Sequence, residues 1–285
     1  MSFPSGSTAR VLAGCWMATG ALTASAQLPL SIEELLVSER TLQLQSAVSY
    51  SNSQTLVPIP VNPGLSSAAP AFNRRQTRVT STTSRLRYGV RPDLEINVSA
   101  VHARAEWRQP GLAGGADQYR LALGASWLVS AENRTPAVLL TAGVDVLESS
   151  WLDPDAKYHG KTGRVGATLY RSIDPLVLSL AAGYEVRGAR DIAGGRLQPG
   201  NLFFLQPQVN FAVNYRVTLT GGVSVQIRER EKVNDATFSL REHGTALNLG
   251  LGVLAGEHST VFVDTRIGTS GDESAQLVLE WLYRF

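Results

Sequence analysis

The sequence lacks the long apolar runs that helical membrane proteins need. No uninterrupted apolar stretch reaches the roughly 18 residues of a membrane-spanning helix, although 44% of the 285 residues are hydrophobic. An excess of one charge sign is also missing, since 26 basic residues oppose 24 acidic ones and the formal net charge is +2. This balance argues against nucleic acid or an acidic polymer as a partner. The chain has material for one large domain but none for helical spans.

Cysteine is nearly absent, because Cys15 is the only one. It lies in an N-terminal segment, residues 1–26, that is typical of a secretory signal peptide: Arg10 precedes an apolar core at residues 11–22, and small residues at 24–26 form a cleavage signal. Cleavage after Ala26 would remove the thiol and with it disulfides, thiol catalysis and cysteine metal sites. The sequence Leu-Ala-Gly-Cys ending at Cys15 also resembles a lipoprotein attachment box, which leaves lipidation as an alternative.

Residues 27–40 are predicted to form a periplasmic leader that contains a short helix. Ser31 followed by Glu34 has the form of a capping box, and the apolar residues after it recur at helical spacing. This predicts an amphipathic helix from residue 31 to about residue 40. The leader is interpreted either as a flexible segment or as a plug at the periplasmic mouth. The apolar positions of this plug helix are Ile32, Leu35 and Leu36.

From residue 41 to the end of the chain, apolar and polar residues alternate with the period of a β-strand. Long loops are predicted after the odd-numbered strands, including residues 52–75 and a Gly-rich loop with Gly111, Gly114 and Gly115, and short turns after the even-numbered ones. About 12 strands are predicted, at residues 42–50, 80–90, 94–107, 119–129, 138–146, 165–169, 176–186, 203–215, 217–227, 247–253, 261–267 and 275–285.

This organisation predicts an all-β fold, a transmembrane antiparallel up-and-down β-barrel formed by residues 41–285. Alternating long and short connections are typical of outer-membrane barrels, and an even strand count places both chain ends in the periplasm. The last strand, AQLVLEWLYRF, has one apolar face and ends on Phe285, as the closing strand of a barrel would. The alternative is a secreted β-sandwich or a lipocalin-like barrel, in which the apolar face points into a protein core.

Aromatic residues and glycines favour lipid as the surroundings of the apolar face. Tyr50, Tyr119 and Tyr184 lie near one end of the apolar bands, as expected for an interfacial girdle. Glycines recur on the polar face, where small residues are of little use to a soluble surface. The girdle predicted at the other end consists of Tyr88, Trp127, Tyr215, Trp281, Tyr283 and Phe285.

The polar face would then line the lumen with charged residues. Two interpretations of these residues stay open: pairs of arginine and carboxylate that brace the wall, or a polar constriction with a slight preference for anions. The residues predicted to line the pore are Arg85, Arg87, Glu95, Arg120, Asp145, Arg164, Glu185, Arg187, Arg228, Asp264, Arg266 and Glu280.

No sequence motif indicates catalysis, a metal or another cofactor. The histidines His102, His159, His243 and His258 have no metal-ligand spacing. An outer-membrane phospholipase would place a serine two residues after a histidine such as His102, and Arg104 stands there instead. A membrane-embedded hydrolase is therefore the least favoured of the hypotheses.

Several stretches resemble one group of outer-membrane barrels. They are residues 31–36 (SIEELL), 88–99 (YGVRPDLEINVS), 172–184 (SIDPLVLSLAAGY), 213–219 (VNYRVTL) and the closing WLYRF. The group includes putative transporters of the phenol meta-degradation type and the barrel domain of Fap-type functional-amyloid secretion channels. The resemblance implies a channel for small apolar compounds or for an unfolded exported polypeptide. The amyloid channels carry a long helical region before the barrel, whereas this chain has only the short predicted helix.

The sequence thus predicts a channel or transporter of the bacterial outer membrane without enzymatic activity. Its partners would be outer-membrane lipid, the barrel-assembly machinery acting on the C-terminal strand, and an unidentified solute or polypeptide; a homo-oligomer is left open. The competing hypothesis is a closed structural or adhesive barrel that acts through its extracellular loops.

Overall fold

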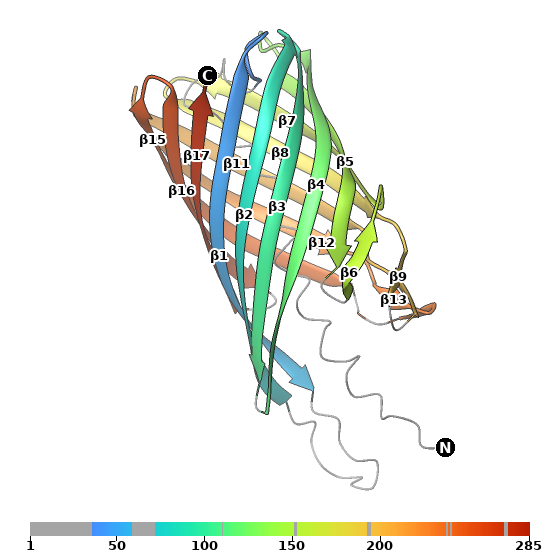
Figure 1. The fold of residues 1–285 in the computed structure, drawn as a ribbon. Helices are drawn as coiled ribbons and strands as arrows, with labels where there is room; N and C mark the ends of the chain where they lie inside the picture. Colours follow the sequence, from blue (N-terminus) through green and yellow to red (C-terminus); the bar gives the residue numbers. More distant parts are fainter. Residues whose placement is uncertain are drawn as a thin grey trace, which may run out of the picture.

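The computed structural model describes residues 36–58, 72–109, 111–150, 153–192, 195–237, 239, 241–270 and 273–285. Within these residues, twelve long strands form one closed antiparallel barrel (Figure 1). They are β1 (Leu42–Pro58), β2 (Phe72–Arg91), β3 (Leu94–Gln109), β4 (Leu112–Ser130), β5 (Ala137–Ser150), β7 (Thr162–Ile173), β8 (Leu176–Arg187), β11 (Leu202–Asn214), β12 (Val217–Arg228), β15 (Glu242–Gly256), β16 (Ser259–Ser270) and β17 (Glu273–Arg284). The predicted fold class is confirmed.

The barrel closes where the first strand meets the last. Each strand pairs with the next along the chain, and β1 pairs with β17 in the register Gln43 to Arg284. Short turns join β2 to β3, β4 to β5, β7 to β8, β11 to β12 and β15 to β16, at the end that also carries the start of β1 and the C-terminus. We call this end the turn end and the opposite one the loop end. The predicted strand segments lie within these strands, except that residue 215 follows the end of β11 and residue 285 follows the end of β17.

The alternation of the sequence separates an apolar outside from a polar inside. On β17, Leu277 and Leu279 are 50% and 52% exposed, whereas Glu280 between the outward positions is 3% exposed. The same pattern recurs around the barrel, with exposed Val, Leu, Ile and aromatic side chains on every second residue. Such a continuous apolar exterior suits a hydrocarbon surrounding, because it would be costly in water. The barrel is therefore a transmembrane one.

The described residues contain no helix, and so none that is long and apolar enough to cross a membrane.

The predicted Gly-rich loop after β3 is wrong. Strand β4 begins only three residues after the last residue of β3, Gly111 before it has a positive φ of 79°, and Gly114 and Gly115 lie inside β4. A Cβ atom on Gly114 would lie 2.6 Å from the ring of Trp107, which occupies the paired position on β3. Gly114 therefore makes room for an inward-facing indole on a neighbouring strand.

The predicted loop at residues 52–75 is also shorter than expected. Residues 52–58 and 72–75 extend β1 and β2, and residues 59–71 lie outside the described residues. Strands β1 to β4 project beyond the rest of the wall at the loop end (Figure 1). Polar residues that pair across two strands, such as Gln54 with Gln76, can continue a hairpin beyond the membrane.

Shorter strands occupy the connections at the loop end. Strand β6 (Asp153–Tyr158) pairs with β5, and a separate four-stranded sheet, which we call the loop sheet, has the order β14-β13-β10-β9. Its strands are β9 (Arg190–Ile192), β10 (Gly195–Gln198), β13 (Lys232–Val233) and β14 (Ala236–Thr237). The loop sheet thus joins the connection that follows β8 to the one that follows β12.

Residues 36–40 are not helical, so the predicted helix does not extend to residue 40. They form a bend and a turn, and the predicted positions Ile32 and Leu35 lie outside the described residues. Glu39 makes a parallel bridge with Gly89 of β2, where Arg40 N donates to Gly89 O at 2.8 Å. Pairing with β2, which extends past the start of β1, replaces the hydrogen bonds that a helix would make.

Candidate functional site

An internal cavity of about 200 Å³ lies inside the barrel wall. Its lining comes from strands on several sides of the barrel, including β2, β3, β4, β7, β8, β11 and β17. The charged residues that line it are Arg85, Arg87, Glu95, Arg120, Arg164, Glu185 and Glu280. These predicted positions thus come together at one cavity. The predicted positions that are not part of its lining are Asp145, Arg187, Arg228, Asp264 and Arg266.

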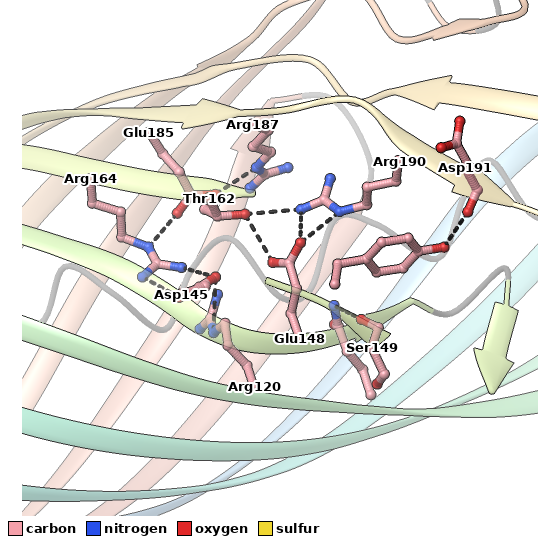
Figure 2. A network of polar contacts seen from close by, with 12 residues as sticks. Arg120, Asp145, Glu148, Ser149, Thr162, Arg164, Glu185, Arg187, Arg190 and Asp191 are labelled. Atoms are coloured by element: carbon pink, nitrogen blue, oxygen red, sulfur yellow. Dashed lines mark hydrogen bonds and ion pairs between the residues drawn. The ribbon is translucent and has the colours of Figure 1, made fainter. Parts of the chain in front are cut away.

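The wall beside the cavity carries a chain of buried ion pairs (Figure 2). Arg164 donates to both carboxylate oxygens of Asp145 at 2.8 and 2.7 Å, and its Nε donates to Glu185 at 2.7 Å. Arg187 donates to the other oxygen of Glu185. Asp145 has no exposed surface, and neither Glu185 nor Arg187 is more than 8% exposed. Because these pairs connect β5, β7 and β8, they brace the wall from inside.

Another buried carboxylate, Glu95, accepts several hydrogen bonds at the turn end of the lumen. Arg87 donates to both of its oxygens at 3.1 and 2.7 Å, and Ser126 Oγ donates to it at 3.2 Å. The backbone N–H of Val37 donates to Glu95 Oε2 at 3.1 Å. Since Leu36 and Val37 are both buried, the segment before β1 enters the turn end of the barrel and is held by an inward-facing carboxylate.

Gly89 is where this segment approaches the wall most closely. A Cβ atom at Gly89 would collide with the carbonyl oxygens of Ser38 and Val37. We expect Gly89→Ala to displace residues 36–41 from β2, at a cost of about 1–3 kcal/mol to their docking. Trypsin should then cleave after Arg40 several times faster than in the unchanged protein.

Gly221→Ala is the matched control for this change, since a Cβ atom there meets nothing within 4 Å. Equal cleavage rates after Arg40 in the two variants would show that the segment does not depend on close contact with β2.

The loop sheet covers the opposite end of the lumen with an apolar contact. Leu197 of β10 is 1% exposed and belongs to one buried cluster with inward-facing residues of β2 and β3. The other members of this cluster are Val79, Ala103, Ala105 and Trp107. The sequence analysis missed this contact, although the inward positions of β3 change from polar to apolar before Trp107 and signal an interior that is not open water.

Polar contacts hold the loop sheet on another side of the barrel. Arg190 of β9 forms a buried ion pair with Glu148 of β5, and it also donates to Thr162 Oγ1 of β7 at 2.9 Å (Figure 2). Tyr158 Oη donates to the backbone oxygen of Asp191 at 2.7 Å. With Leu197 fixed to β2 and β3, the loop sheet is attached to separate parts of the rim and lies over the loop end of the lumen.

The aromatic residues of the predicted girdle lie at the turn end. Two of their polar atoms have partners there: Trp127 Nε1 donates to Asp93 at 3.1 Å and Trp281 Nε1 donates to Ser259 at 2.7 Å. Tyr283 is half-buried between Trp281 and Phe285, with ring centroids at 5.7 and 5.0 Å. The exposed rings are those of Tyr88, Trp127, Tyr215, Trp281 and Phe285. This arrangement suits contact with a membrane interface.

His102 lies on the outer face with a carboxylate and an aromatic ring as neighbours. Its Nε2 is 3.1 Å from Asp117 Oδ1, and its ring stacks on Tyr119 at 4.6 Å. A carboxylate orients an imidazole but does not supply the hydroxyl nucleophile that the hydrolase hypothesis requires. The geometry therefore gives that hypothesis no support.

Comparisons with known proteins identify the fold. No protein-family model and no curated protein matches this chain. Among solved structures, the COG4313 outer membrane channel from Pseudomonas putida F1 is similar, with a TM-score of 0.66, 11% identity, and coverage of 87% of this chain and 97% of that one. The translocator domain of the autotransporter NalP from Neisseria meningitidis has a TM-score of 0.56, 12% identity and coverage of 86% and 88%.

The transport unit of the autotransporter AIDA-I from Escherichia coli is a further neighbour, with a TM-score of 0.54, 13% identity and coverage of 87% and 91%. At these identities the likeness establishes the fold alone. That fold is the β-barrel of outer-membrane channels and transport domains.

Proposed function

We propose that this chain is a gated channel of the bacterial outer membrane that passes small solutes. The observation that carries the proposal is the closed barrel with an apolar exterior and a charged internal cavity. A wall that only anchored the protein in lipid would gain nothing from a polar cavity inside it, because unpaired buried polar groups are costly. The fold shared with a COG4313 outer membrane channel supports the same proposal, as does the predicted signal peptide.

Two parts of the chain itself would form the gates of this channel. Residues 36–41 dock on Gly89 and Glu95 at the turn end, and the loop sheet is attached over the loop end. The cavity between them has room for about seven water molecules by volume. A small solute fits such a space, whereas an unfolded polypeptide does not, so small solutes are favoured over polypeptide export.

Single-channel recording in a planar lipid bilayer tests this function directly. We expect the purified protein to show brief conducting events separated by long closed intervals, because both covers must be displaced for ions to pass. A variant without residues 27–40 should stay open for longer, since the cover at the turn end is then missing. A folded barrel that conducts in neither form would contradict the channel function.

A second candidate function is binding of a partner or surface through the loop end. The observation that favours it is the projection of β1 to β4 beyond the rest of the barrel (Figure 1). The same recordings separate the two functions, because a barrel that serves only as a scaffold for these strands has no need to conduct.

A further inference from the structure

Two of the four arginines that line the cavity differ from the other two in their partners. The guanidinium of Arg164 is paired with two carboxylates and that of Arg87 with Glu95. In contrast, Arg120 Nε lies 4.0 Å from Asp145, whose two oxygens already accept hydrogen bonds from Arg164. Among the described residues, the buried Nε of Arg85 has no hydrogen-bond partner. Two positive groups at this cavity therefore have donors to spare.

Buried donors without acceptors are costly, and a guanidinium cannot lower the cost by losing its proton. The side chain of Arg120 is only 13% exposed, so bulk water hydrates it poorly. The acceptors that match a guanidinium best are the two oxygens of a carboxylate. The partner that these two arginines lack is thus an anion, and the cavity is where it would bind.

The register of the sheet places the two arginines at a suitable separation. Arg85 pairs with Ser99 of β3, Ser99 pairs with Ala122 of β4, and Arg120 is the next inward residue on β4. Their backbones are therefore about 10 Å apart across the strands and about 7 Å apart along them. Two extended arginine side chains span this separation with a small anion between them.

We propose that Arg85 and Arg120 bind the carboxylate of a small organic solute inside the cavity, an inference that rests on the channel function proposed above. The apolar part of the solute packs against Val101, Leu139 and Phe204, which line the same cavity. The volume of about 200 Å³ restricts the solute to a compact one. Glu280 also lines the cavity, so a carboxylate of the protein competes there with a bound anion for the arginines.

Equilibrium binding to the detergent-solubilised full protein tests the site without any need for transport. The probes are benzoate and its neutral isostere benzamide, followed by saturation-transfer NMR and titration calorimetry. We expect benzoate to bind at least about 10-fold more tightly than benzamide, because a hydrogen bond to a charged group contributes about 1.5–3 kcal/mol. Arg85→Gln and Arg120→Gln should each weaken benzoate binding about 10-fold and leave benzamide binding unchanged.

Arg266→Gln is the matched control, since Arg266 is also an inward-facing arginine but does not line the cavity. Equal affinities for the two probes, or the same benzoate affinity in all three arginine variants, would overturn the site. If an arginine variant does not fold, Glu280→Gln tests the site instead. Removing the competing carboxylate should tighten benzoate binding several-fold, and an unchanged benzoate affinity would overturn the site.

The binding result is independent of the channel function. If the protein binds benzoate in this way but never conducts, the carboxylate site is supported and the channel function is contradicted. If the protein conducts but does not distinguish benzoate from benzamide, the channel function is supported and the carboxylate site is contradicted.

Discussion

Replacing Asp145 with alanine is expected to lower the free energy of unfolding by about 3–5 kcal/mol, the usual cost of breaking a buried ion pair by removing one partner. Asp145 is fully buried and accepts two hydrogen bonds from Arg164. Without it, Arg164 keeps only Glu185, which Arg187 also needs, and Arg120 loses its nearest carboxylate. Two buried guanidinium groups would then share Glu185, and that of Arg120 would lose its ion pair.

The stability change can be measured by urea titration of the barrel in lipid vesicles, with tryptophan fluorescence as the signal. Glu106→Ala is the matched control, because it also removes a carboxylate from an arginine but at an exposed pair, in which Glu106 and Arg104 are 54% and 61% exposed. This control should cost less than about 1 kcal/mol. If Asp145→Ala is as mild as the control, water in the lumen hydrates the arginines and the ion pairs do not brace the wall.

The strands and their directions could be predicted from the sequence because each hairpin carries its own information. Alternation defines which residues share a face, and the turn fixes the register. The turn after Ile173, which pairs with Leu176, sets Arg164 opposite Glu185 in the same hairpin. An ion pair of this kind follows from the position of the turn together with the two residue types.

The remaining partners of the charge network could not be predicted in this way. Asp145 reaches Arg164 from β5, and β5 is separated from β7 by a connection whose length does not fix a register. In addition, a β-bulge between Leu121 and Ala122 shifts the register between β4 and β5. The sequence left open whether arginines brace the wall or attract anions. In the structure Arg164 is paired with Asp145 and Glu185. In contrast, Arg85 Nε has no hydrogen-bond partner among the described residues, and Arg120 Nε lies 4.0 Å from Asp145.

Contacts at the two ends of the barrel were missed because they are made by segments without a long alternating pattern. Residues 36–41 contact β2 through the backbone, and a single glycine at position 89 is too weak a signal in the sequence to predict this contact. Strand β10 spans Gly195–Gln198, too short for periodicity to reveal. The burial of Leu197 depends on apolar residues 90 or more positions earlier in the chain, so only the three-dimensional fold shows it.

Replacing Leu197 with aspartate is expected to open the loop end and to increase the conducting fraction of single-channel recordings at least tenfold. Truncation of a buried leucine costs about 2–5 kcal/mol, and a carboxylate in this apolar cluster adds the cost of burying a charge. A change of this size shifts the equilibrium between docked and undocked loop sheet by more than a factor of ten. The ion pair of Arg190 with Glu148 is then the main remaining attachment of the hairpin formed by β9 and β10.

Gln198→Asp is the matched control, because it places the same charge on the next residue of β10, where the side chain is exposed. The recordings should be paired with limited proteolysis of the connection between β8 and β11, which reports undocking independently of conductance. If Leu197→Asp makes this connection sensitive to protease but conducts no more than Gln198→Asp, the loop sheet undocks without controlling passage. The barrier to ions would then lie deeper in the lumen, at the cavity that Arg85, Arg120 and Glu280 line. The segment docked at the turn end would then be the only gate left in the proposal.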